Sequence, residues 1–163
     1  MEKKLVITND GSHSIFVPQL NECYHSRHGS ILESEYVFIK NGLLADNKKQ
    51  FNILEIGFGT GLNALLTAEK AKQKGISVNY HAIELYPVTE EHYSQLNFTE
   101  LIGIEKGDFI QLHKAEWEEK YKINKLCKNT IASFKLAKIT PLKLRKFQDS
   151  WSLNHNPSTV NKY

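Results

Sequence analysis

Apolar and polar positions in the first part of the chain follow two patterns, which predict a β-hairpin and then a helix. Residues 5–8 and 14–17 are short strand-like runs on either side of the turn residues 9–12, as in a β-hairpin. Residues 30–44 place apolar side chains at helical spacing, and an Asn-Gly pair at 41–42 predicts the end of that helix. We expect one face of this helix to be buried.

The middle of the chain has the pattern of a strand, a turn, a helix and a second strand. The apolar run 51–56 stops at the glycine-rich turn 57–61, and helical spacing follows over 62–74, with Gly75 as the C-cap. Residues 76–84 then alternate with period two, as a strand does. This order is that of a βαβ unit, with parallel strands and a right-handed crossover.

The rest of the chain is less regular. Thr89 opens a further helix, residues 109–117 predict another, and residues 134–139 alternate as a strand would. The pattern is then lost, so we expect residues 140–163 to form a divergent, basic and polar tail that is poorly ordered. The predicted fold class is α/β with an incomplete parallel sheet, and the sheet belongs to a domain spanning residues 1–139.

The composition is that of a soluble globular protein. The 163 residues are 40% hydrophobic and 24% charged, which fits one domain at about 150 residues per domain. Two cysteines, Cys23 and Cys127, are too few for a secreted disulfide framework. No apolar run approaches the roughly 20 residues that span a bilayer, and the N-terminus has no signal-peptide core. We therefore expect a cytoplasmic protein without membrane contact.

Charge is distributed unevenly along the chain, although the net charge is only +3. Residues 1–119 contain 11 basic and 17 acidic side chains, whereas residues 120–163 contain 10 basic side chains and a single acid, Asp149. Such asymmetry is typical of a nucleic-acid-binding tail or of a C-terminal segment with a different origin. Both interpretations remain open on charge alone.

The glycine-rich turn carries the clearest chemical signal. Glycines after a parallel strand let the backbone turn tightly and let a ligand approach the main chain, beside the positive end of a helix. A P-loop needs Gly-Lys-Ser/Thr, but Gly61 is followed by Leu62 and Asn63. A dinucleotide-binding fingerprint needs its third glycine one residue later than Gly61. Both phosphate-binding motifs are therefore disfavoured.

The spacing that remains, an acid before Gly-x-Gly-x-Gly, is that of Rossmann-like class I S-adenosylmethionine-dependent methyltransferases. The acid is Glu55, which we expect to face the cationic end of the cofactor, and the glycines are Gly57, Gly59 and Gly61. Glu84 ends the next predicted strand, where a carboxylate is placed to accept hydrogen bonds from both ribose hydroxyls. The alternative is a turn that merely connects a strand to a helix.

Residues 21–38 are rich in polar side chains, and three of them could ligate a metal. Cys23, His25 and His28 are of the right types, but their spacing lacks paired ligands and no second ligand cluster follows. We therefore expect no metal. A solvated polar loop is a second interpretation of this segment.

Several separated motifs resemble the MnmC/MnmD methyltransferase family. The first reads Glu-x-Tyr-His-Ser-x-x-Gly-x-x-x-Glu-Ser-x-x-Val-Phe-Ile over residues 22–39. The second reads Leu-Glu-Ile-Gly-Phe-Gly-Thr-Gly-Leu-Asn-Ala-Leu-Leu-Thr over residues 54–67. Residues 80–88 and 109–117 also look like segments of this family, so the resemblance covers about residues 5–139.

The resemblance implies a reaction and a cofactor pocket. The family uses S-adenosylmethionine to methylate the exocyclic amine of 5-aminomethyl-2-thiouridine at the tRNA wobble position, which gives 5-methylaminomethyl-2-thiouridine. A neutral amine receives the methyl group directly, so catalysis rests on positioning and desolvation, and no general base is identified in this chain. The residues that the resemblance places in or beside the cofactor pocket are Tyr24, Glu33, Gly57, Gly59, Gly61, Asn63 and Glu84.

The chain departs from the family toward its C-terminus. The family's Asp-Ala-Phe-x-Pro segment, which sits at the substrate amine, has no counterpart here, so we expect the chain to be truncated relative to the family. Residues 140–163 are then either a frameshift product or a basic tRNA-binding segment. Two further hypotheses are a non-catalytic fragment of the family and, less favoured, a dinucleotide-binding oxidoreductase.

Overall fold

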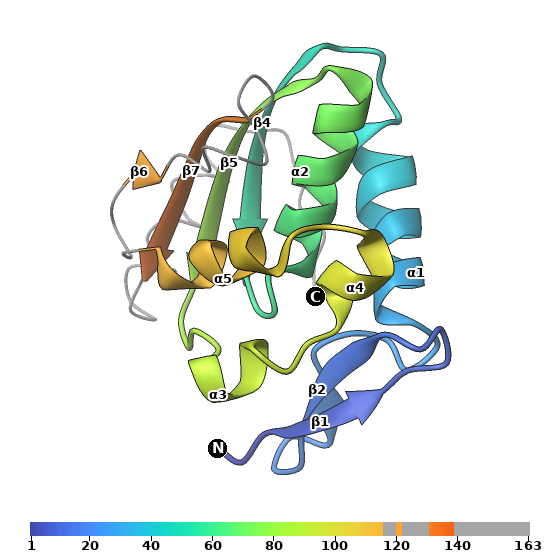
Figure 1. The fold of residues 1–163 in the computed structure, drawn as a ribbon, viewed down its shortest axis with the longest axis vertical. Helices are drawn as coiled ribbons and strands as arrows, with labels where there is room; N and C mark the ends of the chain where they lie inside the picture. Colours follow the sequence, from blue (N-terminus) through green and yellow to red (C-terminus); the bar gives the residue numbers. More distant parts are fainter. Residues whose placement is uncertain (116–119, 122–130, 139–163) are drawn as a thin grey trace, which may run out of the picture.

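The computed structural model describes residues 1–115, 120–121 and 131–138, and it has the predicted α/β architecture (Figure 1). A three-stranded antiparallel sheet near the N-terminus lies beside a four-stranded, mostly parallel sheet with helices packed around it. The predicted tail, residues 140–163, lies outside the described residues.

The N-terminal sheet begins with the predicted hairpin. Strand β1 (Lys4–Ile7) pairs antiparallel with β2 (His13–Val17), and Lys4 lies opposite Phe16. Strand β3 (Glu22–Cys23), which the pattern did not predict, pairs with the other edge of β2. A tight turn creates this third strand, because the Asn21 N–H donates to the Pro18 carbonyl at 3.1 Å and returns the chain to β2.

The predicted helix over residues 30–44 is present but changes type along its length. It starts as α1 (Ser30–Ser34) and continues as a π-helix, η1 (Glu35–Leu43). At the end of η1 the Leu44 N–H donates to the Ile39 carbonyl five residues back, at 2.9 Å, which is the π-helical bond. The helix therefore runs past the Asn-Gly pair that was expected to end it.

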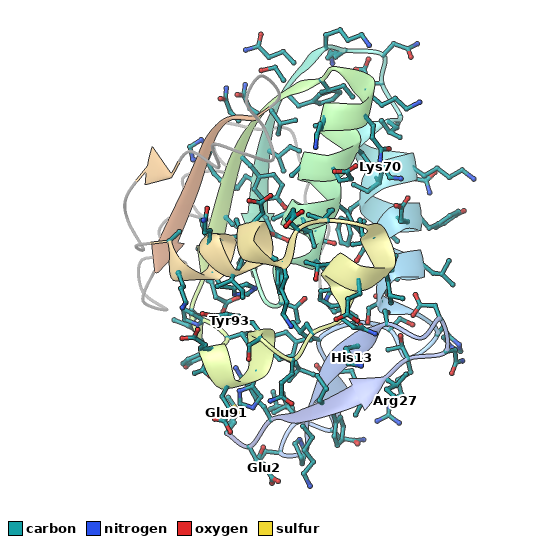
Figure 2. The ribbon with its side chains drawn as sticks, viewed as in Figure 1. Glu2, His13, Arg27, Lys70, Glu91 and Tyr93 are labelled. Carbon is teal, nitrogen blue, oxygen red and sulfur yellow. The ribbon has the colours of Figure 1, made fainter. Side chains whose placement is uncertain are left out.

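The predicted βαβ unit is confirmed. Strand β4 (Gln50–Ile56), helix α2 (Leu62–Lys74) and strand β5 (Ser77–Glu84) follow in order, and β4 and β5 pair in parallel. Gly75 ends α2 in the left-handed region, with a φ of 61° that favours glycine. In Figure 2, Lys70 of α2 lies on the side that faces α1 and η1, consistent with its 3.1 Å ion pair with Glu35.

The larger sheet has the order β4-β5-β7-β6. Strand β7 (Ile131–Lys138), predicted over 134–139, pairs in parallel with β5, and the short β6 (Lys120–Tyr121) pairs antiparallel with β7. Within the described part of the chain β4 is one end of this incomplete sheet. Because β4 and β5 pair in parallel, their carboxyl ends lie side by side.

Three helices follow β5 and cover the ends of both sheets (Figure 1). Thr89 precedes the short α3 (Glu90–Tyr93), as predicted, whereas α4 (Phe98–Ile102) was not predicted. Helix α5 (Lys106–Lys114) begins three residues before the predicted start at Phe109. No helix among the described residues has both the length and the apolar character that a membrane crossing requires.

One hydrophobic core joins the two sheets. Buried members come from every layer, among them Ile15 of β2, Ile39 of η1, Leu65 of α2, Val78 of β5 and Phe109 of α5. Polar contacts reinforce the union, since the backbone N–H of β2's first residue, His13 (labelled in Figure 2), donates to the Asn97 side chain before α4 at 2.8 Å. The N-terminal hairpin and helix therefore pack into the same hydrophobic core as the βαβ unit.

Candidate functional site

The glycine-rich turn between β4 and α2 has a conformation that only glycine adopts without strain. Gly57, Gly59 and Gly61 have φ values of 86°, 55° and 75°. At Gly61 a Cβ would lie 2.8 Å from the Phe58 ring and 3.1 Å from His113, so no side chain fits there. The spacing of the three glycines is thus required by the local backbone.

The backbone donors of this turn are largely occupied within the protein. The N–H groups of Gly57 and Phe58 donate to the Ile83 carbonyl at 2.8 and 3.3 Å, and the Gly61 N–H donates to the Phe58 carbonyl at 2.9 Å. The Gly59 N–H donates to Glu84 Oε2 at 2.8 Å. A phosphate-binding turn aims such groups at its ligand, so this turn is poorly suited to hold a phosphate.

Glu84, at the end of β5, is a well-satisfied carboxylate. Besides the bond from Gly59, its Oε1 accepts the backbone N–H groups of Leu85 and Tyr86, each at 2.8 Å. A carboxylate has about four acceptor positions, so roughly one remains for a ligand donor. Acceptance of both ribose hydroxyls, as predicted, then requires one position to be shared.

Glu55, near the end of β4, is in the opposite situation. Its Oε1 accepts a hydrogen bond from Asn63 Nδ2 at 3.1 Å, but its Oε2 is buried without a hydrogen-bond partner. Burial raises the pKa of Glu55 to about 8; hydrogen bonds from Asn63 and Tyr80 oppose the rise, and the nearby Glu84 charge adds to it. Glu55 is therefore largely protonated at neutral pH unless a cation approaches it.

Asn63 provides a second buried acceptor without a partner. Its Oδ1, like Glu55 Oε2, has no hydrogen-bond partner, and Ser34 Oγ is the one other such side-chain atom in the described part of the chain. Native proteins rarely leave buried polar atoms unsatisfied, so each such atom calls for an explanation. With Glu55 ionised, both oxygens are acceptors, which suits a ligand that brings N–H donors and a positive charge, such as an ammonium group.

A cleft of about 320 Å³ lies over the turn. Among its lining residues are the predicted Tyr24, Glu33, Gly57, Gly59, Asn63 and Glu84. Of the predicted residues, Glu55 lies behind Asn63 and Gly61 faces His113, so neither lines the cleft. The structure thus brings most of the predicted pocket residues into one cavity within the lower range of small-molecule sites, roughly 300–1,000 Å³.

The cleft is acidic. Its lining includes Glu33 and Glu84 but, among the described residues, neither lysine nor arginine. His25 also lines it, and burial lowers the pKa of His25 to about 4, against the opposing influence of the Glu33 and Asp10 charges. The histidine is therefore neutral at pH 7. Such a cavity favours a cationic or neutral ligand over a phosphate.

Tyr24 and Glu33 come from the N-terminal layer and form one wall of the cleft. The Tyr24 ring packs against Gly59, where a Cβ would lie 3.2 Å from ring carbon Cδ1. Glu33 of α1 accepts the Ser26 N–H at 2.8 Å through Oε2. Both residues also line a neighbouring open cavity of about 340 Å³ that includes Arg27. Tyr24, His25 and Glu33 of the N-terminal layer are consequently part of the cleft wall.

The structure gives the surroundings of two of the three candidate metal ligands in this segment. His25 Nε2 lies 2.6 Å from Thr60 Oγ1, and Cys23 is a free thiol. Within residues 1–115, 120–121 and 131–138 no group of three or more potential ligands is arranged to hold a metal ion.

Sequence reasoning missed several residues of the site. Val37 and Phe38 of η1 line the cleft, and Thr60 and His113 contact each other across the turn. Phe38 lies within the first family-like motif and Thr60 within the second, so their positions were marked, though not their roles. Nothing in the local pattern distinguished His113 from any other helical histidine.

Curated relatives of this chain carry the name tRNA 5-methylaminomethyl-2-thiouridine biosynthesis bifunctional protein MnmC. The protein from Cupriavidus metallidurans is 31% identical over 98 residues, which are 56% of this chain and 14% of the relative. The protein from Leptospira interrogans is 34% identical over 98 residues, 54% of this chain and 15% of the relative. The resemblance to MnmC proteins is confirmed. No family model matches the chain, which spans only about a seventh of the length of these relatives.

A solved structure shares the fold. MnmC2 from Aquifex aeolicus matches with a TM-score of 0.60 at 23% sequence identity, over 89% of this chain and 45% of that chain. At this identity the likeness concerns the fold alone. It confirms the predicted Rossmann-like α/β class with an incomplete parallel sheet.

Proposed function

We propose that this chain binds S-adenosylmethionine and takes part, in the cytoplasm, in methylating the exocyclic amine of 5-aminomethyl-2-thiouridine at the tRNA wobble position. Support comes from the MnmC relatives, whose name places them in the biosynthesis of the methylated nucleoside in tRNA. The acidic cleft over the glycine turn supports the cofactor assignment independently.

The buried, partnerless oxygens of Glu55 and Asn63 are the observation that carries the proposal. They sit behind a cleft without lysine or arginine among its described lining residues, next to a turn in which the N–H groups of Gly57, Phe58, Gly59 and Gly61 are already bonded. A dinucleotide would place a pyrophosphate at the glycine turn, in a cleft whose charged lining residues are Glu33 and Glu84, and like charges repel there. A cofactor with an ammonium and a sulfonium group suits the same acids, which disfavours the oxidoreductase hypothesis.

Each part of the site has a role in this proposal. Glu84 accepts hydrogen bonds from ribose hydroxyls, and Glu55 with Asn63 accepts the donors of an ammonium group. Gly57 and Gly59 let the ligand approach the backbone. When bound, S-adenosylmethionine supplies an electrophilic methyl group.

The N-terminal layer serves exclusion and positioning. Tyr24 and Glu33 form the wall opposite the glycine turn, and the buried Phe58 and Leu62 keep water away from the base of the cleft. Because the acceptor is a neutral amine, the protein's contribution is to align it and to exclude water. An acceptor for the released proton need not be a strong base.

Calorimetric titration of the full chain with S-adenosylmethionine tests the proposal. We expect micromolar binding that is weakened at least about tenfold in Glu84→Ala, since one charge-assisted hydrogen bond contributes about 1.5–3 kcal/mol. Glu91→Ala, an exposed change on α3, is the matched control and should bind as the wild type does. A folded wild type that binds no cofactor would contradict the assignment.

Activity needs a second measurement. Transfer of a labelled methyl group to tRNA that carries 5-aminomethyl-2-thiouridine separates an enzyme from a non-catalytic fragment. Binding without transfer would support the fragment hypothesis, whereas transfer that Glu84→Ala reduces would support the enzyme.

A further inference from the structure

Thr60, in the middle of the glycine turn, is held at its hydroxyl and at its backbone carbonyl. Its side chain is buried, with 1% of the residue exposed. His25 Nε2 lies 2.6 Å from its Oγ1, and His113 Nε2 lies 3.0 Å from its carbonyl oxygen. The two histidines are 35 residues before and 53 residues after Thr60, so two distant parts of the chain contact the turn.

The contact to the Thr60 hydroxyl comes from the segment between β3 and α1. The His25 ring packs edge-on against Phe98 of α4 with centroids 6.1 Å apart, and the backbone N–H of His25 donates to Ser14 Oγ at 3.1 Å. The preceding residue, Tyr24, packs against Gly59. Two consecutive residues of the N-terminal layer therefore contact two consecutive residues of the turn.

The contact to the Thr60 carbonyl comes from His113 of α5. The Thr60 carbonyl can only accept, so His113 donates from Nε2 and carries its proton there. The His113 ring is stacked on Tyr93 at 4.3 Å and lies edge-on to Phe58 at 5.3 Å. Tyr93 lies in α3, below α5 in the view of Figure 2. These ring contacts leave the imidazole little freedom to turn away.

We propose that His25 and His113 are positioning residues that hold the Gly57–Gly61 turn, through Thr60, in the form in which the Gly59 N–H meets Glu84. Three glycines in five residues give this turn unusual conformational freedom when it is free. Bonds to Thr60 from outside remove that freedom before a ligand arrives. The hairpin and first helix are therefore part of the cofactor site, beyond their contribution to the core.

Both bonds persist at neutral pH. Burial lowers the pKa of each histidine to about 4; the Glu33 and Asp10 charges oppose the shift at His25, and the bond to Thr60 opposes it at His113. Neutral rings are the forms that fit the contacts described above.

Amide hydrogen exchange measured by NMR on the unliganded full chain tests the inference without any cofactor. We expect exchange at Gly59 to speed up about tenfold in His25→Ala and in Thr60→Val, as for one lost hydrogen bond. Leu66, buried in α2, is the reference amide and should change little. His113→Phe, which keeps an aromatic ring but loses the donor, should behave like Thr60→Val.

Conservative variants provide the rescue. His25→Gln places an amide where Nε2 was, and Thr60→Ser keeps the hydroxyl, so both should leave Gly59 close to its wild-type rate. Should His25→Ala not fold, the Thr60→Ser and Thr60→Val pair gives the same comparison. Wild-type exchange at Gly59 in Thr60→Val and His113→Phe overturns the inference. So does equal acceleration at Gly59 and Leu66, because the histidines would then support the fold as a whole.

The cofactor arm of the test rests on the proposed function. Titration of the same variants with S-adenosylmethionine should show about tenfold weaker binding in Thr60→Val and recovery in Thr60→Ser. Unchanged affinity in a variant with a loosened turn would overturn the link between turn order and binding. A wild type that binds no cofactor contradicts the proposed function alone, since the exchange result does not depend on it.

Discussion

Glu84 and Glu55 stand at the ends of neighbouring parallel strands, yet the fold treats the two carboxylates in opposite ways. Glu84 receives three backbone N–H groups, from Gly59, Leu85 and Tyr86. Glu55 accepts a hydrogen bond from Asn63 on Oε1, while its Oε2 is buried without a partner. Both oxygens of the first carboxylate accept hydrogen bonds without a ligand, whereas one oxygen of the second does not.

This difference separates structural from ligand-dependent chemistry within one site. Backbone N–H groups hold the Glu84 side chain in place, and the bond from Gly59 ties it to the glycine turn. Glu55 is stable in the unliganded protein only as the neutral acid, because burial disfavours its charge. An approaching cation would reverse that preference. In the unliganded fold the position of Glu84 is therefore already fixed, whereas the charge of Glu55 depends on the ligand.

The largest expected effect is on the pH dependence of stability. The pKa of Glu55 is raised to about 8 in the folded protein from 4.5, so the folded state binds the extra proton between these values. Stability of the unliganded protein should therefore fall as pH rises from about 5 to 8. The contribution of this group is at most about 1.4 kcal/mol per pH unit. Urea unfolding at pH 5 and pH 8 measures it.

Glu55→Gln isolates this contribution. The amide is neutral at both pH values, so the variant should lose the part of the slope that belongs to Glu55 and be more stable than the wild type at pH 8. Equal slopes in the variant and the wild type would show that Glu55 is not buried as a neutral acid. Cofactor affinity of the variant should fall, because the amide has no charge for an ammonium group.

Removal of the satisfied carboxylate should have a smaller effect. Glu84→Ala leaves three backbone N–H groups without their acceptor, and orphaned donors cost about 1–3 kcal/mol when buried. Water can replace part of the loss because Glu84 is only half-buried. We expect the free energy of unfolding at pH 7 to fall by about 1–2 kcal/mol. Glu91→Ala is the control, and a loss no larger than in that control would contradict the structural role of Glu84.

The contrast between the two acids also marks what the sequence could predict. The period of two over 76–84 and the glycine spacing placed Glu84 beside the turn, because strand ends and left-handed glycines follow from local rules. The burial of Glu55, and the absence of a partner for its Oε2, depend on how Tyr80 and Asn63 pack around it. No local pattern contains that information.

The same limit applies to the rest of the site. The hairpin, the βαβ unit and half of the residues that line the cleft could be predicted from periodicity, turn chemistry and family-like motifs. Strand β3 escaped prediction because two residues are too few to show a period. The bonds of His25 and His113 to Thr60 join positions far apart in sequence, and only the tertiary fold brings them together.

Asp10 sharpens the comparison with the smallest expected effect. Like Glu84 it is well supplied with donors: Oδ1 accepts the Ser12 N–H at 3.0 Å and the Thr8 hydroxyl at 2.7 Å, and Oδ2 accepts the Leu32 N–H at 3.0 Å. Partial burial works against ionisation, but hydrogen bonds from Ser12, Leu32 and Thr8 prevail and lower the pKa of Asp10 to about 2 from 3.8.

The sign of this effect is opposite to that of Glu55. A lowered pKa stabilises the fold above about pH 4, and the contribution is lost as pH falls toward 2. Asp10 is substantially solvated, which reduces the expected contribution to about 1 kcal/mol or less. The loss of stability between pH 4 and pH 2 in urea unfolding should be smaller in Asp10→Asn than in the wild type, while Glu55→Gln should not change it. Equal losses in Asp10→Asn and the wild type would mean that the donors around Asp10 stabilise its neutral form as well as its charged form. The number of N–H donors around a carboxylate would then not explain the difference between Glu84 and Glu55.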